Sequence, residues 1–242
     1  MGVSNSPLPF HRLDDECLTI FVSFRANANS VPASFWMLAE VIRDSQLLIR
    51  VREAIVRNRI DSLHGTLDFD WTNLCNEPLL QSIYAETLRL HVAIFILRSS
   101  ERKDVNIRGW LIPRSAPILV SGYNAQMNPE DWQTKGDPNI RPVGDFWAER
   151  FLQPSKSGED LVFSLKGCAG TWLPYGGGQR MCPGRHFAKL EMISSLAIIL
   201  TIFDVEIADA ISGIPANEMK GFGFGALWPK GKLPVRMRRR EI

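Results

Sequence analysis

The stretch Tyr175-Gly176-Gly177-Gly178-Gln179-Arg180-Met181-Cys182-Pro183-Gly184 decides how the rest of this 242-residue chain is interpreted. It places one cysteine in a glycine-rich loop directly before an apolar run, 187–203, whose length predicts a buried helix. Glycine lets the backbone adopt a positive φ and approach a flat ligand closely. We therefore expect Cys182 at a helix N-terminus, where exposed N–H groups and the helix dipole favour a thiolate.

Several readings of this loop compete. A glycine-rich turn before a helix is common, and a lone cysteine is often only a small buried hydrophobe. The dinucleotide-binding fingerprint fails because Met181 stands at its last glycine position, and no Gly-Lys-Ser/Thr follows to make a phosphate loop. A thiolate beside Arg180 is, in contrast, a ligand that haem iron accepts.

The stretch resembles the haem-binding signature of the cytochrome P-450 family, aromatic-x-x-Gly-x-Arg-x-Cys-x-Gly. Gly178, Arg180, Cys182 and Gly184 match it, and Tyr175 replaces the usual phenylalanine. The resemblance implies heme b (iron protoporphyrin IX) as cofactor, with Cys182 as the axial ligand of the iron. It also implies that Tyr175, Gly178 and Gly184 surround the haem and that Arg180 binds a propionate.

A charged pair in the expected helix 77–90 supports this interpretation. Glu86 and Arg89 stand three residues apart on one helix face, where they can pair. An apolar run follows the helix and indicates burial, where an unpartnered charge is costly, and Arg150 is a candidate third partner. The resemblance assigns Glu86 and Arg89 to the family's E-x-x-R pair and makes the three residues a structural support for the cysteine loop. It also places Arg98 at a haem propionate.

The segment 17–43 has a helical pattern that Pro32 interrupts. Proline removes a backbone donor and disfavours helical geometry in the residue before it, so 27–32 is expected to form a kink or a locally opened turn. A helix boundary at Pro32, capped by Asn and Ser side chains, fits the residues equally well.

In the cytochrome P-450 family the helix over the distal haem face usually carries an acid followed by threonine, which help to deliver protons. That pair is absent here. The segment instead resembles the branch that contains cholesterol 7-alpha-hydroxylase and prostacyclin synthase, with Asn29 or Ser30 in the threonine's place. Since that branch includes oxygen-inserting and rearranging enzymes, the resemblance leaves the reaction type open.

The expected fold class is mainly α with small antiparallel β-sheets (α+β), the C-terminal portion of a cytochrome P-450 fold. A complete member would be about twice as long, so residues 1–242 are expected to form a partial domain whose N-terminal half is missing. The expected segments are a distal helix at 17–43, the E-x-x-R helix at 77–90, a small sheet and meander at 94–173, the cysteine loop and final helix at 174–203, and C-terminal strands at 204–240.

Composition excludes other classes. The net charge of +2 argues against a nucleic-acid partner. The four cysteines form no C-x-x-C pair, which argues against a zinc site and favours a reducing compartment. No apolar run approaches the roughly twenty residues of a membrane span. We expect this chain to lack an anchor and to be cytoplasmic, whereas a full-length parent would associate with the cytosolic face of the endoplasmic reticulum membrane.

The hypothesis that follows is a haem-thiolate monooxygenase acting on an apolar small molecule such as a sterol or terpenoid. Its electrons would come from an NADPH-cytochrome P-450 reductase type donor. A haem-thiolate isomerase or dehydratase that does not use O2 is the alternative suggested by the missing acid and threonine. A truncated, non-catalytic fragment is the third.

Overall fold

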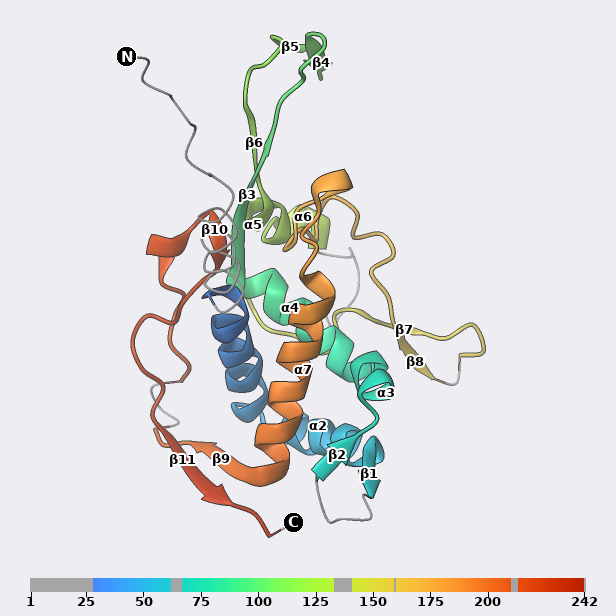
Figure 1. Ribbon diagram of the computed structural model, residues 1–242, viewed down its shortest axis with the longest axis vertical. Helices are drawn as coiled ribbons and strands as arrows, with labels where there is room; N and C mark the ends of the chain where they lie inside the picture. Colours follow the sequence, from blue (N-terminus) through green and yellow to red (C-terminus); the bar gives the residue numbers. More distant parts are fainter. Residues whose placement is uncertain (1–27, 62–66, 133–140, 159, 210–212, 242) are drawn as a thin grey trace, which may run out of the picture.

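The computed structural model describes residues 28–61, 67–132, 141–158, 160–209 and 213–241, and it confirms the expected α+β class (Figure 1). The helices are the stretch 28–42, here called the distal helix, and α2 (Ser45–Arg57), α3 (Trp71–Asn76), α4 (Pro78–His91), α5 (Gly122–Gln126), α6 (Pro129–Trp132) and α7 (Arg185–Ile202). The strands are β1 (Arg59–Asp61), β2 (Leu67–Phe69), β3 (Val92–Arg98), β4 (Val105–Ile107), β5 (Trp110–Ile112), β6 (Ile118–Ser121), β7 (Leu152–Pro154), β8 (Leu161–Phe163), β9 (Phe203–Ile207), β10 (Phe224–Ala226) and β11 (Val235–Arg239).

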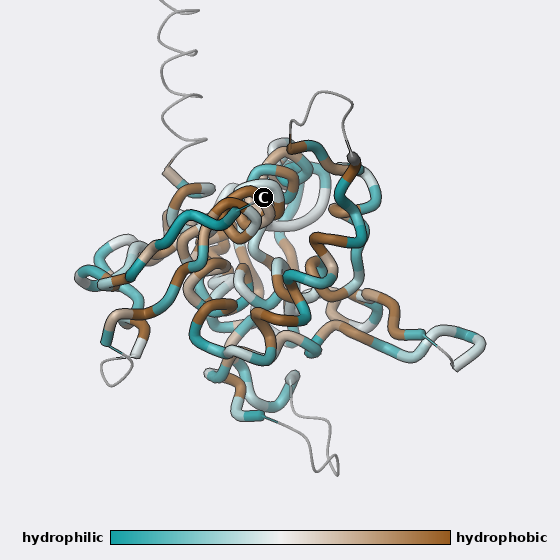
Figure 2. The backbone as a smooth tube through the Cα atoms, turned by 90° about the horizontal axis from the view of Figure 1, so that it is seen from below, coloured by the Kyte–Doolittle hydropathy of each residue, from teal (hydrophilic) through white to brown (hydrophobic). Residues whose placement is uncertain are grey.

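The core lies where α4, α7, α2 and the distal helix pack together (Figure 1). Helix α4 is buried along nearly its whole length, so its apolar residues face neighbours on all sides. Leu80 and Ile83 of α4 and Ile193 and Leu200 of α7 are fully buried. Figure 2 shows that the apolar parts of the chain gather among these helices while the outer loops are more hydrophilic. Burial of this apolar surface is the main stabilising contribution to the arrangement.

The distal helix corrects the expectation at Pro32. Residues 28–42 are helical without interruption, so Pro32 neither ends the helix nor opens a turn within them. One missing donor costs less than the burial of the residues that follow, among them Trp36 and Met37, which are fully buried. The expected first part of this segment, 17–27, lies outside the described residues.

The sheets are small and antiparallel. The largest in the described chain has the strand order β10-β3-β6, and β3 follows α4 directly, with no residue between His91 and Val92. Strands β3 and β6 lead away from the core to the paired strands β4 and β5, which form the projecting tip in Figure 1. The sheet therefore connects the buried helix α4 to the edge strand β10.

The stretch between α2 and α4 contains short elements of regular structure. Strands β1 and β2 pair, and α3 follows them. The Asp70 carboxylate caps α3 by accepting a hydrogen bond from the Asn73 amide at 2.9 Å. Elements of three to six residues are too short to leave a clear period in the sequence.

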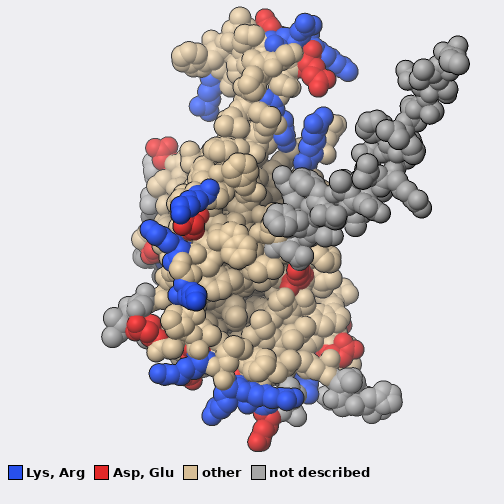
Figure 3. All heavy atoms as spheres, turned by 60° about the vertical axis from the view of Figure 1, so that its left-hand side comes forward, with Lys and Arg blue, Asp and Glu red and all other residues tan. Residues whose placement is uncertain are grey.

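At the lower end of the molecule β9 pairs with β11, whose residues are exposed. Figure 3 shows Lys and Arg side chains along this end, while the middle of the same face is mostly uncharged. Asp204 of β9 accepts from Arg52 at 2.9 Å and from Arg238 at 3.0 Å, and these bonds tie the strand pair to α2. In the parts of the chain that the structure describes, no helix combines the length and apolar character of a membrane span.

Candidate functional site

A cavity of about 280 Å³ lies between the distal helix, β10, the cysteine loop and the start of α7. We call it the cysteine cavity. Its lining is mainly apolar and consists of Asn29, Ser30, Ala33, Leu88, Val92, Ile94, Pro174, Tyr175, Cys182, Gly184, Phe187, Ala188, Glu191, Met192, Phe224, Gly225 and Ala226. Five residues predicted from the sequence thus line the same cavity, although they are up to 155 residues apart in the chain: Asn29, Ser30, Tyr175, Cys182 and Gly184.

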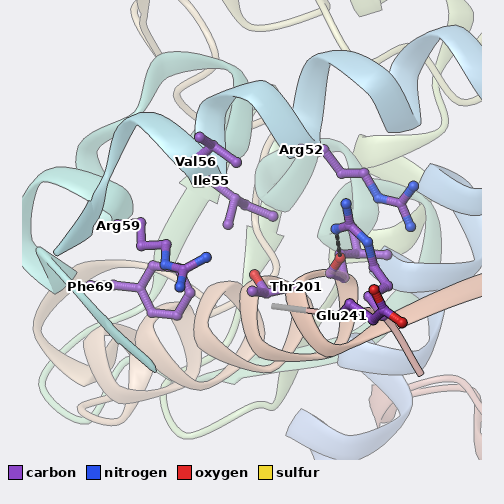
Figure 4. Close-up of a pocket in the computed structure, with 9 residues that line it drawn as sticks. Arg52, Ile55, Val56, Arg59, Phe69, Thr201 and Glu241 are labelled. Atoms are coloured by element: carbon purple, nitrogen blue, oxygen red, sulfur yellow. Dashed lines mark hydrogen bonds between the residues drawn. The ribbon is translucent and has the colours of Figure 1, made fainter. Parts of the chain in front are cut away.

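A different hollow, of about 120 Å³, lies at the other end of α7 and contacts α2 (Figure 4). Arginines and a glutamate surround it, among them Arg52, Arg59 and Glu241, and the side chain of Arg240 donates to the carbonyl of Leu200 at 3.1 Å. It contains no thiol, histidine or hydroxyl pair that suggests a reaction. The cysteine cavity is therefore the candidate site.

The loop holds Cys182 at the cavity by backbone geometry. The Cys182 amide donates to the Tyr175 carbonyl at 3.0 Å, and a 3₁₀ turn, η1 (Gly178–Arg180), lies between them. Gly176 and Gly178 have φ of 75° and 69°, which side chains with a Cβ rarely adopt. The thiol of Cys182 is exposed, and Gly184 is the N-cap of α7. Cys182 consequently lies beside the positive end of the helix dipole.

Tyr175 connects this loop to α4. Its hydroxyl lies 2.7 Å from the hydroxyl of Tyr84, and burial raises the pKa of Tyr175 to about 12. Burial also raises the pKa of Tyr84, so both hydroxyls stay protonated and can share the hydrogen bond. The indole of Trp172 adds a second link by donating to the Ala85 carbonyl at 2.9 Å.

Glu86, Arg89 and Arg150 lie in one buried network. The Arg89 guanidinium donates to both carboxylate oxygens of Glu86, at 2.7 and 2.8 Å, and both side chains are fully buried. Arg150 donates to Oε1 of Glu86 at 2.8 Å, and the amide of Trp147 does so at 3.1 Å. Burial lowers the pKa of Arg150, and the charge of Glu86 opposes this shift. The carboxylate thus has partners on all sides, as a buried charge requires.

The network reaches the cysteine loop through Gln126, which the sequence does not single out. Arg89 donates to the Gln126 carbonyl at 3.0 Å, and the fully buried Gln126 amide donates to the carbonyls of Arg89 and Val92 at 3.1 and 3.0 Å. Its oxygen accepts from the Leu173 amide at 3.0 Å, two residues before Tyr175. A glutamine in a short helix carries no sequence signal for this role, because its partners lie far away in the chain.

The structure separates the two predicted propionate-binding arginines from the cavity lining. Arg98 lies at the end of β3 and donates to the carbonyl of Gly177 at 2.6 Å, so it supports the cysteine loop. Arg180 is exposed in η1 and makes no hydrogen bond or ion pair with other described residues. Neither arginine is among the residues that line the cysteine cavity.

On the opposite wall the distal helix contributes Asn29 and Ser30. Ser30 is buried, whereas Asn29 is exposed and its Oδ1 accepts a hydrogen bond from the Ala226 amide at 2.9 Å. Residue 27, the first of the segment 27–32 expected to kink or open, is outside the described residues.

The match to the model of the family described as "Cytochrome P450", over residues 12–235, agrees with this arrangement of thiol, buried ion pair and distal helix. The chain belongs to the cytochrome P450 family. It is 38% identical to the cytochrome P450 monooxygenase efuG of Hormonema carpetanum over 237 residues, which cover 89% of this chain and 42% of that protein. The cytochrome P450 monooxygenases fsoE of Humicola fuscoatra and calL of Penicillium decumbens are 36% and 34% identical, and each alignment covers 89% of this chain and 40% of the relative. The chain thus spans about two fifths of the length of these relatives.

Cytochromes P450 bind haem, and the residues at the cysteine cavity fit that group. An exposed thiol lies on the cavity wall, the adjacent loop runs through glycines, and the remaining lining is largely apolar, as a flat apolar macrocycle needs. A Cβ at Gly184 would lie 3.8 Å from the Cys182 sulfur, and one at Gly178 would meet nothing within 4 Å. Glycine is therefore favoured at position 178 by its positive φ, since a Cβ there would have space. In the described part of the chain no group of three or more His, Cys, Asp or Glu side chains forms an alternative metal site.

Proposed function

We propose that this cytochrome P450 chain forms the haem-binding part of a haem-thiolate monooxygenase that oxidises an apolar small molecule, a sterol, a terpenoid or a similar secondary metabolite. O2 would be the oxidant, and a reductase of the NADPH-cytochrome P-450 type would supply electrons. The observation that carries the proposal is the exposed thiol of Cys182 on the wall of an apolar cavity. The names of the three fungal relatives, all cytochrome P450 monooxygenases, support it.

In this proposal the residues around the cysteine cavity have distinct roles in binding haem and substrate. The bound haem supplies oxygen activation, which a thiolate ligand favours. Cys182 holds the iron through its sulfur as a thiolate, with the start of α7 stabilising the negative charge. The apolar lining excludes water and binds an apolar substrate. Ser30, with Asn29 beside it, holds a proton at the distal wall, and Arg98 and Arg180 contribute positive charge for the propionates.

We also propose a structural role for Glu86, Arg89 and Arg150. Their network, extended by Gln126, fixes the backbone just before Tyr175 and so the position of the thiol. They support the iron ligand without touching a reacting atom. The proposed segment boundaries follow the same division into distal helix, E-x-x-R helix, sheet and meander, cysteine loop with final helix, and C-terminal strands. For a full-length parent we propose the cytosolic face of the endoplasmic reticulum membrane.

The test is a carbon monoxide difference spectrum of the reduced, haem-loaded protein. We expect a thiolate-type band that Cys182→Ala abolishes. Cys168→Ala is the matched control, because its half-buried thiol lies outside the cysteine cavity, and this variant should keep the band. A Cys182→Ala protein that retained the thiolate-type band would overturn the assignment.

A second candidate is a haem-thiolate isomerase or dehydratase that acts on a peroxide or another activated substrate. The absence of the family's usual acid and threonine, with Asn29 or Ser30 in the threonine's place, favours it, as does the resemblance to the branch of cholesterol 7-alpha-hydroxylase and prostacyclin synthase. Turnover without a reductase or NADPH would select this candidate. A fragment without activity is the third, and a haem titration that produces no bound spectrum would select it.

A further inference from the structure

Two side chains of the distal helix bind the backbone at the end of strand β10 and just after it. Backbone groups in a strand alternate between its two edges, and the Leu227 amide faces β3, where it donates to the His91 carbonyl at 2.8 Å. The Ala226 amide lies on the other edge and donates to Asn29 Oδ1 at 2.9 Å. The Leu227 carbonyl accepts from Nε1 of Trp36 at 2.6 Å. Asn29 thus binds the unpaired edge of β10 at Ala226, and Trp36 binds the carbonyl of the residue that follows the strand.

The one acceptor and the one donor, Asn29 and Trp36, are spaced on the distal helix so that both reach this backbone. Asn29 and Trp36 are seven residues apart, which is about two helical turns, so both project from the same face. Trp36 is fully buried, and its ring stacks on His91 with a centroid distance of 4.1 Å and an interplanar angle of 3°. The imidazole of His91 is itself held by Asn217 Oδ1 at 2.7 Å. The indole is thus fixed from two sides.

Gly225 shows how closely the helix and the strand approach each other. Its φ is 146°, and a Cβ at this position would overlap the Asn29 carboxamide. Only glycine meets both conditions without strain. The neighbouring Phe224 lines the cysteine cavity, and 83% of its surface is exposed.

We propose that Asn29 and Trp36 are positioning residues that fix β10 as one wall of the cysteine cavity and so determine which substrates fit. This inference rests on the proposed function for its link to substrate. The Asn29 side-chain oxygen accepts the hydrogen bond from β10, and Ser30 is the residue that holds a proton at the distal wall. Loss of the Asn29 hydrogen bond frees β10 and widens the space next to Phe224, so bulky ligands respond more strongly than small ones.

Hydrogen–deuterium exchange of residues 222–228 tests the contact itself, with no need for haem or substrate. Asn29→Ala should accelerate exchange of the Ala226 amide about two- to tenfold, the range expected for one lost hydrogen bond. Asn29→Asp keeps an acceptor oxygen and should exchange as the wild type does. Asn58→Ala is the control, since the Asn58 side chain donates to the Ala54 carbonyl in α2, far from β10 in the sequence, and its loss should leave this segment unchanged. Unchanged exchange in Asn29→Ala, or equal acceleration in Asn29→Asp, would overturn the proposal.

The effect on ligands is measured in the haem-loaded protein with imidazole and 4-phenylimidazole as probes. Asn29→Ala should change the Kd of 4-phenylimidazole at least threefold more than that of imidazole, and Asn29→Asp should restore the wild-type ratio. Equal changes for the two probes would refute the specificity role. Failure to bind haem at all would refute the proposed function, while the exchange experiment would still decide the contact between Asn29 and β10.

Discussion

Replacing Glu86 by glutamine removes the single negative charge that two buried arginines share. The carboxylate receives two hydrogen bonds from Arg89 and one from Arg150, and the side chains of Arg89 and Glu86 are fully buried. Breaking a buried pair by removing one partner costs about 3–5 kcal/mol. Since domains of this size are stable by about 5–15 kcal/mol, Glu86→Gln should consume a large part of the free energy of unfolding.

The assay is urea unfolding followed by circular dichroism. With a urea dependence of about 2 kcal/mol per molar, Glu86→Gln should lower the midpoint by about 2 M. Glu149→Gln makes the same chemical change in a partly exposed pair with Arg50, and it should cost less than about 1 kcal/mol. If the two variants lost the same stability, the idea that burial of the Glu86 network dominates its energetics would be wrong.

Three further outcomes are expected. Tyr175→Phe leaves the buried Tyr84 hydroxyl without its partner and should cost about 1–3 kcal/mol, whereas the double Phe variant should recover part of this loss; additive costs in urea titrations would contradict the bond between the hydroxyls. The hydrogen bond from Arg238 lowers the pKa of Asp204, so the Asp204 carboxylate stabilises the fold at neutral pH and loses this effect as the pH falls below about 3.8. Asp204→Asn should therefore show a smaller difference between the urea midpoints at neutral and acidic pH than the wild type does. An unchanged difference would disprove this role. Gln126→Leu removes the side-chain bonds that join the carbonyls of Arg89 and Val92 to the Leu173 amide, and it should lose about 2 kcal/mol and weaken haem binding in a titration; wild-type affinity would argue against this link.

Local sequence patterns predicted those parts of the molecule that depend on residues close together in the chain. The residues of the loop around Cys182, and the pair Glu86 and Arg89, follow spacings that are specific to few kinds of structure. The final helix was expected from a long apolar run, and α7 covers most of it. The α+β class followed from the resemblance to the cytochrome P-450 family that this loop and this pair carry.

Contacts between residues far apart in the chain could not be predicted from local sequence patterns. The bond between Tyr84 and Tyr175 spans 91 positions and that between Trp36 and Leu227 spans 191, so no local period reports either. The prediction at Pro32 was wrong for a related reason. Its local preference favoured a break, but packing of the residues after it on the core outweighs one lost hydrogen bond.

The direct junction between His91 and Val92 restricts how this chain can vary in length. Helix α4 carries the buried ion network, and β3 carries the cavity-lining Val92 and Ile94. Side chains alternate between the two faces of a strand, so one inserted residue at the junction would turn every side chain of β3 to the opposite face. Ile94 would leave the cavity, and the pairing with β10 and β6 would shift. Insertions are tolerated in most connections between helices and strands, but here the absence of a loop makes the residue count itself a requirement for a complete cavity wall.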